Sequence, residues 1–211
     1  WVTNQFHESP CDARCVSENT GFQGSTMARN LYITATESRS GKSAIVLGVM
    51  QMLLRDIRRV GFFRPIINDV PDRKDHDIDL VLSQFYLGLQ YNETYALTMR
   101  QAKELVNAGQ HSLLIEKVIN KYKELESKCD FVLLEGTDFE GTSPAFEFDI
   151  NADIAANLGS PLLVISNACQ KTEHEIISST KLAVESFADK AVDILGVVIN
   201  RTDVPDREAL R

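Results

Sequence analysis

The stretch "TATESRSGKSAIVLG", residues 34–48, joins a polar loop to an apolar run through Gly41-Lys42-Ser43. A loop that cradles phosphate groups has the pattern Gly-x-x-x-x-Gly-Lys-Ser/Thr and lies between a strand and a helix. A short apolar segment, Leu31–Ala35, precedes this loop, and a segment predicted to be helical, Ser43–Arg59, follows it. The order strand, loop, helix favours a nucleotide site over an incidental Gly-Lys-Ser in an ordinary turn.

The chemistry of such a loop depends on converging positive groups. The loop amides and the N-terminus of the following helix present N–H groups to anionic oxygens, and Lys42 adds a positive charge. The Ser43 hydroxyl is placed to hold Mg²⁺ beside the phosphates. We expect Lys42 to face solvent when no nucleotide is bound. The predicted nucleotide-binding residues of the loop are Thr36, Glu37, Ser38, Arg39, Ser40, Gly41, Lys42 and Ser43.

Thr36 stands where the pattern has its first glycine. Glycine is needed at that position only if the residue adopts a positive φ or lets another backbone come very close. A β-branched side chain disfavours the left-handed region, so we expect the loop to begin in extended geometry. After the loop, residues 44–50 are apolar nearly all round, which predicts a helix buried against a sheet, with Gly48 allowing close packing.

The rest of the chain alternates short apolar runs with helical patterns. The runs are continuous rather than alternating, as expected for strands covered on both faces. This order predicts an α/β domain with a mostly parallel sheet, helices on both faces and a P-loop NTPase-like fold. The predicted strands are Leu31–Ala35, Val60–Phe63, Phe131–Leu134, Leu162–Ser166 and Ile194–Ile199. The predicted helices are Ser43–Arg59, Ile78–Leu87, Thr98–Ala108, Ser112–Leu125, Ala152–Asn157 and Glu173–Phe187.

Length and composition indicate one acidic domain. A chain of 211 residues is long enough for one full α/β domain, and its net charge of −8 argues against a nucleic-acid partner. No apolar run approaches the roughly 20 residues of a membrane span, and the four cysteines form no disulfide framework, which predicts a cytoplasmic protein. Residues 1–26 lack an apolar period, so we interpret them as a disordered leader or a mis-called start before a domain at 27–211.

Polar residues follow several of the predicted strands, at the edge where parallel sheets bind ligands. Glu135 follows the apolar run at 131–134, and a carboxylate there can hold Mg²⁺, although it could also be a solvated charge. Arg64 follows the run at 60–63 and could clamp a phosphate or a carboxylate, or could be a surface arginine. Asn200 ends the last strand, where its amide can donate and accept hydrogen bonds or start a turn.

Four segments together carry a resemblance to a known family. They are "NLYITATESRSGKSAIVLGVMQ", "FFRPI", "DFVLLEGTDF" and "GVVINR", and they lie in that order between Met27 and about Asp203. This part of the chain resembles the N-terminal, dethiobiotin-synthetase-like domain of the long form of bacterial phosphate acetyltransferase. The loop itself is similar to the variant phosphate loop of dethiobiotin synthetase, which also has Thr at the position of Thr36.

The resemblance implies a ligand and the roles of several residues. It implies that the domain binds Mg²⁺ with ATP or another purine nucleotide, and that Asn200 reads the adenine edge. Arg64 takes the place of a lysine that polarises substrate and phosphate in dethiobiotin synthetase. The implied metal ligands are Ser43, Glu135 and one of two aspartates that open a helix, Asp79 or, less favoured, Asp77. Aspartates at such a position can also serve only as caps or dipole partners.

Three functions are compatible with these residues. The first is a nucleotide-binding sensor or assembly domain of phosphate acetyltransferase, which interconverts acetyl-CoA and phosphate with coenzyme A and acetyl phosphate. By the resemblance, acyl transfer belongs to separate C-terminal domains, which would be partners of this domain within a homo-oligomer. The second is a free-standing ATP-dependent carboxylase or amide ligase like dethiobiotin synthetase, and the third is a module whose loop binds nothing. The altered loop 136–141 disfavours the second, and the retained Lys42, Ser43 and Glu135 disfavour the third, so we adopt the first.

Overall fold

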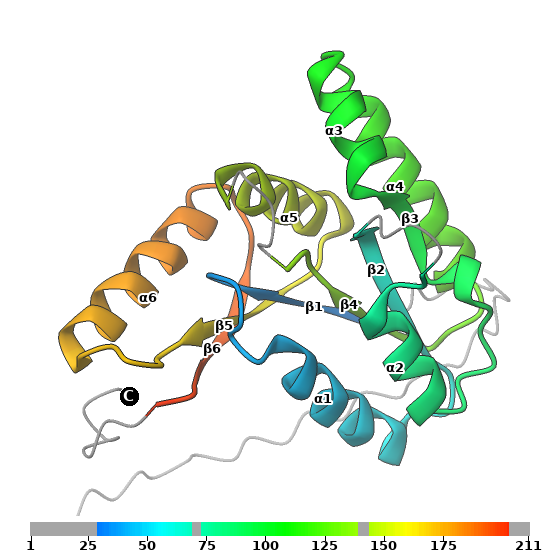
Figure 1. The fold of residues 1–211 in the computed structure, drawn as a ribbon. Helices are drawn as coiled ribbons and strands as arrows, with labels where there is room; N and C mark the ends of the chain where they lie inside the picture. The colour runs from blue at the N-terminus through cyan, green and yellow to red at the C-terminus, as the bar shows by residue number, and fades with distance from the viewer. Residues whose placement is uncertain (1–28, 69–72, 139–143, 203–211) are drawn as a thin grey trace, which may run out of the picture.

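A computed structural model describes residues 29–68, 73–138 and 144–202 of the chain (Figure 1). It contains one six-stranded sheet with the order β3-β2-β4-β1-β5-β6, in which every neighbouring pair is parallel. The predicted α/β class with a parallel sheet is confirmed. The strands are β1 (Arg29–Ala35), β2 (Val60–Ile67), β3 (Tyr95–Thr98), β4 (Phe131–Glu135), β5 (Leu162–Asn167) and β6 (Ile194–Asn200). The α-helices are α1 (Lys42–Asp56), α2 (His76–Gln84), α3 (Met99–Asn107), α4 (His111–Glu126), α5 (Pro144–Leu158) and α6 (Glu173–Ala188), and a short 3₁₀ helix spans Tyr91–Glu93.

Helices cover both faces of the sheet, and each face has its own apolar core (Figure 1). On one face, α1 and α2 pack against the sheet through side chains that include Met50 and Ile78. On the other face, α4 and α5 form most of the cover, and Phe187 of α6 joins them by stacking near Phe148 with ring centroids 4.3 Å apart. The continuous apolar runs of the central strands follow from this, because both faces must be apolar.

The topology places the Gly-Lys-Ser loop at a crossing point of the sheet. β1 lies between β4 and β5, the chain runs from β1 to β2 on one side, and it later crosses from β4 to β5 on the other. Connections that leave in opposite directions open a crevice beyond the carboxyl ends of such strands. The loop that follows β1 therefore lies beside the carboxyl end of β4.

The structure corrects three details of the sequence-based prediction. β3 was not predicted, because its four residues give no apolar run long enough to register as a strand. α5 begins at Pro144, eight residues before the predicted start at Ala152. α1 is buried along one line only, through Lys42, Val46 and Met50, whereas Met52 is 63 % exposed.

Gly48 does not perform the predicted packing role. Apart from the backbone of α1 itself, no atom of a described residue lies within 4 Å of the position that a Cβ would take there, so Gly48 allows no close approach within the described ranges. An apolar composition on all sides of a helix therefore did not predict full burial. Within the described ranges, no helix is both long enough and apolar enough to cross a membrane. The predicted leader 1–26 and the expected domain start at Met27 lie outside the described residues.

Candidate functional site

The loop between β1 and α1 begins as an extension of β1. The Thr36 N–H donates to the Ile165 carbonyl at 3.0 Å, which continues the pairing of β1 with β5. The left-handed residues of the loop are Arg39, with φ 54°, and Gly41, with φ 81°. Thr36 avoids the left-handed region, as predicted for a β-branched residue, because the turn that needs positive φ falls later in the loop.

α1 begins directly after this turn, and its N-terminus is open to a ligand. Gly41 is the N-cap residue, and no side chain of a described residue caps the helix. The first N–H groups of an α-helix have no partner within the helix, and they attract anions together with the helix dipole. The geometry at Gly41 is therefore compatible with the anion site that the sequence predicts, and binding itself stays a prediction.

The end of β6 holds the loop in place through two side chains. Asn200 Nδ2 donates to the Ser40 carbonyl at 2.8 Å, and Arg201 Nη1 donates to the Arg39 carbonyl at 2.6 Å. A Cβ added at Gly41 would lie 2.4 Å from Asn200 Nδ2, so glycine is also required there by space. Asn200 thus has a role in fixing the loop, and its predicted role in reading adenine stays a prediction.

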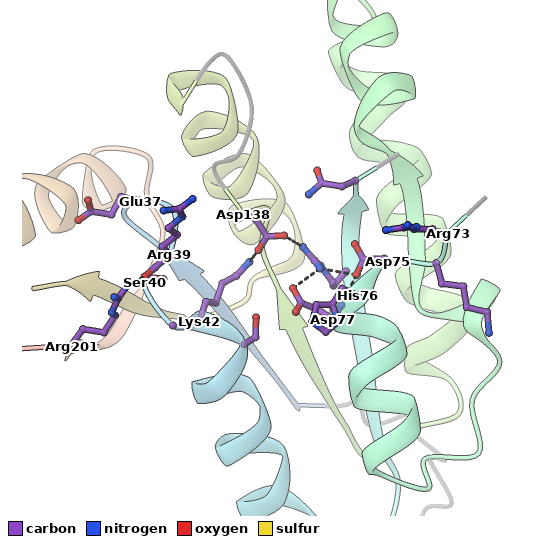
Figure 2. A pocket seen from close by; sticks show the side chains of 16 residues that line it. Glu37, Arg39, Ser40, Lys42, Arg73, Asp75, His76, Asp77, Asp138 and Arg201 are labelled. Carbon is purple, nitrogen blue, oxygen red and sulfur yellow. Dashed lines mark hydrogen bonds and ion pairs between the residues drawn. The ribbon is translucent and has the colours of Figure 1, made fainter. Parts of the chain in front are cut away.

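Lys42 points into the protein toward the carboxyl end of β4, as Figure 2 shows for Lys42 and Asp138. Its Nζ lies 2.7 Å from Asp138 Oδ1 and 3.4 Å from Glu135 Oε1. The same Nζ donates to the Gly136 carbonyl and, at 3.1 Å, to the Thr137 carbonyl. The expectation that Lys42 faces solvent is wrong, because the side chain is only 5 % exposed. The adjacency of β1 and β4 puts these acceptors within reach of the first residue of α1.

Arg64 lies inside the site rather than on the surface. Its Nη1 lies 2.7 Å from Asp75 Oδ1 and 2.7 Å from Asp77 Oδ2, and its Nη2 pairs with Asp138. Burial by itself lowers the pKa of Arg64, but the surrounding carboxylates outweigh it and the net shift is upward. Arg64 is therefore a permanent, buried positive charge shared among three aspartates.

Glu135 is the most deeply buried carboxyl group of the site. It is 0 % exposed, and neither of its oxygens has a hydrogen-bond partner among the described residues. Burial raises its pKa to about 7, against the opposing effect of Lys42 and Arg64. Burial also acts to raise the pKa of Asp138, but Lys42 and Arg64 outweigh it and hold that pKa below its usual value. The two acids at one strand end thus differ in charge state near neutral pH.

The carboxylates that converge on this site are Asp77, Glu135 and Asp138, and they offer oxygens within 4.8 Å of one another. The favoured prediction, Asp79, is not among them, because its side chain is 63 % exposed and pairs with Lys74 at 3.8 Å. α2 starts at His76 with Asp75 as its N-cap, and two residues of an α-helix are about 200° apart around the axis. When Asp77 faces the site, Asp79 must face away from it.

A cavity of about 660 Å³ opens in front of these groups (Figure 2). Its volume is in the range of small-molecule sites. Predicted site residues that line it are Glu37, Arg39, Ser40, Gly41, Lys42, Ser43 and Arg64. Asp77, the less favoured metal ligand of the prediction, also lines it. The lining residues that had not been predicted are Ala35, Asn68, Arg73, Lys74, Asp75, His76, Asp138 and Arg201. Four further predicted site residues, Thr36, Ser38, Glu135 and Asn200, are not part of the lining, and the loop 136–141 is described only to Asp138.

Asn151 of α5 supports the end of β4 and had no signal in the sequence. Its side chain accepts from the Thr137 N–H at 3.1 Å, and its Nδ2 lies 2.9 Å from Thr137 Oγ1. Tyr32 of β1 also donates to Asn151 Oδ1 at 2.8 Å. These contacts fix Thr137 directly before Asp138, so the position of Asp138 depends on a helix that precedes β5.

Fold and site together define a P-loop α/β domain, with the loop at the carboxyl edge of a parallel sheet and a lysine at the start of the following helix. The chain belongs to the AAA_26 family, described as an AAA domain, whose model matches residues 29–211.

Known proteins that resemble the chain include phosphate acetyltransferases. The phosphate acetyltransferase of Nitratidesulfovibrio vulgaris is 55 % identical over 183 residues, which cover 86 % of this chain and 26 % of that protein. The phosphate acetyltransferase of Synechocystis sp. is 37 % identical over 176 residues, covering 83 % of this chain and 25 % of that protein. The resemblance stated from the sequence motifs is thus confirmed, and the chain spans about a quarter of the length of these relatives. A solved BceF tyrosine kinase domain, with a TM-score of 0.48 and 17 % identity over 81 % of this chain and 67 % of that chain, is too distant to support a conclusion.

Proposed function

We propose that this chain is the nucleotide-binding domain of a phosphate acetyltransferase, and that it binds a purine nucleoside phosphate together with Mg²⁺. The observation that carries the proposal is the loop 36–43, which follows β1, ends in a left-handed Gly41 and opens an uncapped helix onto a cavity of about 660 Å³. Backbone N–H groups, a helix N-terminus and a lysine in this order are suited to phosphate oxygens. Similarity to phosphate acetyltransferases supports the wider assignment.

The charges of the site support a divalent cation beside the nucleotide. Lys42 and Arg64 face four carboxyl groups, Asp75, Asp77, Glu135 and Asp138. Within this inner cluster the carboxylates outnumber the cations even when Glu135 is protonated, and a divalent cation would offset their repulsion of a phosphate. Arg39, Arg73, Lys74 and Arg201 also line the cavity and would attract a phosphate. Hard cations such as Mg²⁺ take oxygen ligands, usually from one or two carboxylates and the substrate phosphates.

The residues placed to hold such an ion are Ser43, Glu135 and Asp77. Ser43 lies in the first turn of α1 and lines the cavity. Glu135 has two buried oxygens without hydrogen bonds, which a metal ion would satisfy. Asp77 replaces Asp79 of the sequence-based hypothesis because its side chain faces Glu135. Asp138 is left out of this set, since Lys42 and Arg64 each engage one of its oxygens.

In this proposal the domain does not itself transfer acetyl groups. The polar groups at this edge of the sheet belong to the phosphate loop or to the paired cations and carboxylates beside it. Acyl transfer requires hydrogen-bond donors aimed at a developing oxyanion, and these would need a separate pocket. The domain would act instead by coupling, in which bound nucleotide shifts the activity or the assembly of the whole enzyme. A coenzyme A release assay with acetyl-CoA and phosphate should find no turnover by this chain.

Thermal unfolding tests nucleotide binding directly. At a hundredfold excess of ligand over Kd, binding to the folded state should stabilise it by about 2.7 kcal/mol and raise the melting temperature. The measurement compares ATP, ADP and GTP, each with Mg²⁺ and with EDTA, on the wild type and on Lys42→Met. Lys190→Met is the matched control, because Lys190 pairs with Asp149 at 2.8 Å and does not line the cavity. No shift with any nucleotide would overturn the proposed function.

A further inference from the structure

Asp138 connects the two buried cations of the site. Its Oδ1 lies 2.7 Å from Lys42 Nζ, and its Oδ2 pairs with Arg64 Nη2. Lys42 belongs to α1, Arg64 to β2, and Asp138 follows β4, so one carboxylate joins three elements. The Asp138 side chain is 21 % exposed, against 5 % and 2 % for the two cations. It therefore stands between the cations and the open cavity, which all three residues line.

Two cations that each hold one oxygen of the same anionic group form an anion site. A terminal phosphoryl group has several equatorial oxygens and could take one hydrogen bond from a lysine and one from an arginine, as the carboxylate does here. In a phosphate loop, the backbone amides hold the inner phosphates and the lysine reaches the outer ones. In this structure Lys42 reaches Asp138 and two carbonyls of the same segment instead.

The network would tolerate the departure of Asp138. Arg64 keeps Asp75 and Asp77, each at 2.7 Å, and Lys42 keeps Glu135 at 3.4 Å. The backbone before Asp138 would not need to move, because Thr137 is held by Asn151 and the Gly136 N–H donates to the Ile33 carbonyl at 2.9 Å. A rotation of the Asp138 side chain would expose both cations to the cavity.

We propose that Lys42 and Arg64 form the subsite for the terminal phosphate of a nucleoside triphosphate, and that Asp138 occupies this subsite until the triphosphate displaces it. The inference rests on the proposed nucleotide binding and adds a preference within it. The outer phosphate of a diphosphate can reach Lys42 but does not extend to Arg64, so Asp138 competes with it less than with a triphosphate. A triphosphate must displace Asp138, and it therefore binds more weakly than it would if the subsite were empty.

The same cluster also permits the opposite role for Asp138. Its oxygens lie within 4.8 Å of ligand atoms of Asp77 and Glu135, so it could be a metal ligand rather than a competitor. The two roles predict opposite effects of removing its charge. Loss of a metal ligand weakens binding of a Mg²⁺ nucleotide, whereas loss of an internal competitor strengthens binding of the triphosphate.

The experiment measures Kd for ATP and ADP, both with Mg²⁺, by isothermal titration calorimetry on the wild type and on Asp138→Asn. ATP should bind the variant about tenfold more tightly, because the fraction of subsites free of the competitor rises. ADP should change by less than about twofold, so the ratio of the two Kd values changes in favour of ATP. Asp149→Asn, an exposed aspartate paired with Lys190 at 2.8 Å, removes the same charge away from the cavity and should leave both Kd values unchanged.

Each other outcome has a definite meaning. If ATP binds Asp138→Asn equally or more weakly, Asp138 is a metal ligand or a structural partner and the inference is wrong, while the proposed function stands. If the Kd values of ATP and ADP fall by the same factor in the variant, the effect is general electrostatics and the proposed subsite is wrong as well. If neither nucleotide binds the wild type or the variant, the proposed function is wrong and the inference falls with it. Binding of ATP by the variant alone would support both.

Discussion

The strands β2 and β4 have an ion pair at each end, and the two ends are built very differently. At the amino end, Arg59 and Asp130 pair just before the strands begin, with side chains 62 % and 45 % exposed. Beside the carboxyl end of β4, and within β2, Arg64 is 2 % exposed and is engaged by Asp75, Asp77 and Asp138. Water screens the charges of the exposed pair. The buried arginine and its aspartates are shielded from water, so their charges must compensate one another. The contrast shows that the buried charges of the two pairs lie at the carboxyl end, where they depend on one another rather than on water.

The largest difference between the two ends should appear when each arginine is removed. Arg64→Leu leaves three aspartates around a buried position without their shared cation, and it should lower the free energy of unfolding by about 3–5 kcal/mol. The matched variant Arg59→Leu should leave the unfolding midpoint unchanged, because its pair is exposed. Urea unfolding of both proteins makes the comparison. Equal losses in the two variants would mean that burial does not separate the two ends.

The pH dependence of stability should arise from the carboxyl end. The pKa of Glu135 is raised to about 7 in the folded protein from 4.5, so the folded state holds this proton more tightly than the unfolded state. Stability from this group is fully present below pH 4.5 and is lost as the pH rises to about 7, by a total on the order of 3 kcal/mol.

Urea unfolding without divalent cations, repeated across this pH range on wild type and Glu135→Gln, measures that loss. The substitution should flatten the slope, because Gln cannot ionise. Asp138 does not contribute in this window, since its lowered pKa affects stability only under more acidic conditions. A slope that persists in Glu135→Gln would assign the titration to another group.

Lys42 tests whether the lysine of the loop also stabilises the fold. Lys42→Met removes the partner of Asp138 and Glu135 and should cost about 2–3 kcal/mol, less than loss of Arg64 because Glu135 can take up a proton. Urea unfolding without nucleotide gives the value. Lys190→Met breaks a pair with Asp149 in which the side chains are 32 % and 57 % exposed, so it is the control and should cost much less. A neutral Lys42→Met would show that the interior position of this side chain contributes nothing to the folded state.

The smallest predicted effect compares two left-handed glycines. Gly41 has φ 81° and faces Asn200, whereas Gly88, which follows α2, has φ 69° and open space around its Cβ position. Gly88→Ala should cost about 1 kcal/mol for the backbone alone, and Gly41→Ala about 1 kcal/mol more for the displaced Asn200 hydrogen bond. Thermal unfolding measures both, and the double variant Gly41→Ala, Asn200→Ala should show the excess to be non-additive. An additive result would mean that Asn200 does not constrain Gly41.

The sequence was most informative where local pattern and topology agree. The five longer strands are near their predicted positions, since each is a continuous apolar run in a sheet covered on both faces. The proximity of Lys42 and Glu135 followed from one rule, that parallel strands place their carboxyl ends on one edge. Arg64 was expected just after its strand but lies within β2, which continues to Ile67. Thr36 was correctly expected to avoid the left-handed region, because it is β-branched.

The remaining features depend on contacts that no local pattern records. The choice of Asp77 over Asp79 follows from Asp75 being the N-cap of α2, which sets the rotation of the helix. The inward direction of Lys42 follows from its contacts after β4, which include two carbonyls 94 and 95 positions away and the carboxylate of Asp138. β3 was missed because its hydrogen bonds to β2, and not its own composition, make it a strand.

The hydrogen bond from Asn200 to the Ser40 carbonyl joins the first loop of the sheet to its last strand, across 160 positions of sequence. During synthesis, β1 and the loop emerge from the ribosome long before β6, and domains fold as their chain becomes available. Until β6 joins the sheet, the loop has the residues of a phosphate site but lacks the hydrogen bond from Asn200. A nascent or truncated chain that ends before β6 would therefore contain the loop sequence without the hydrogen bond that fixes its conformation. Ligand binding would then indicate that the whole sheet has formed.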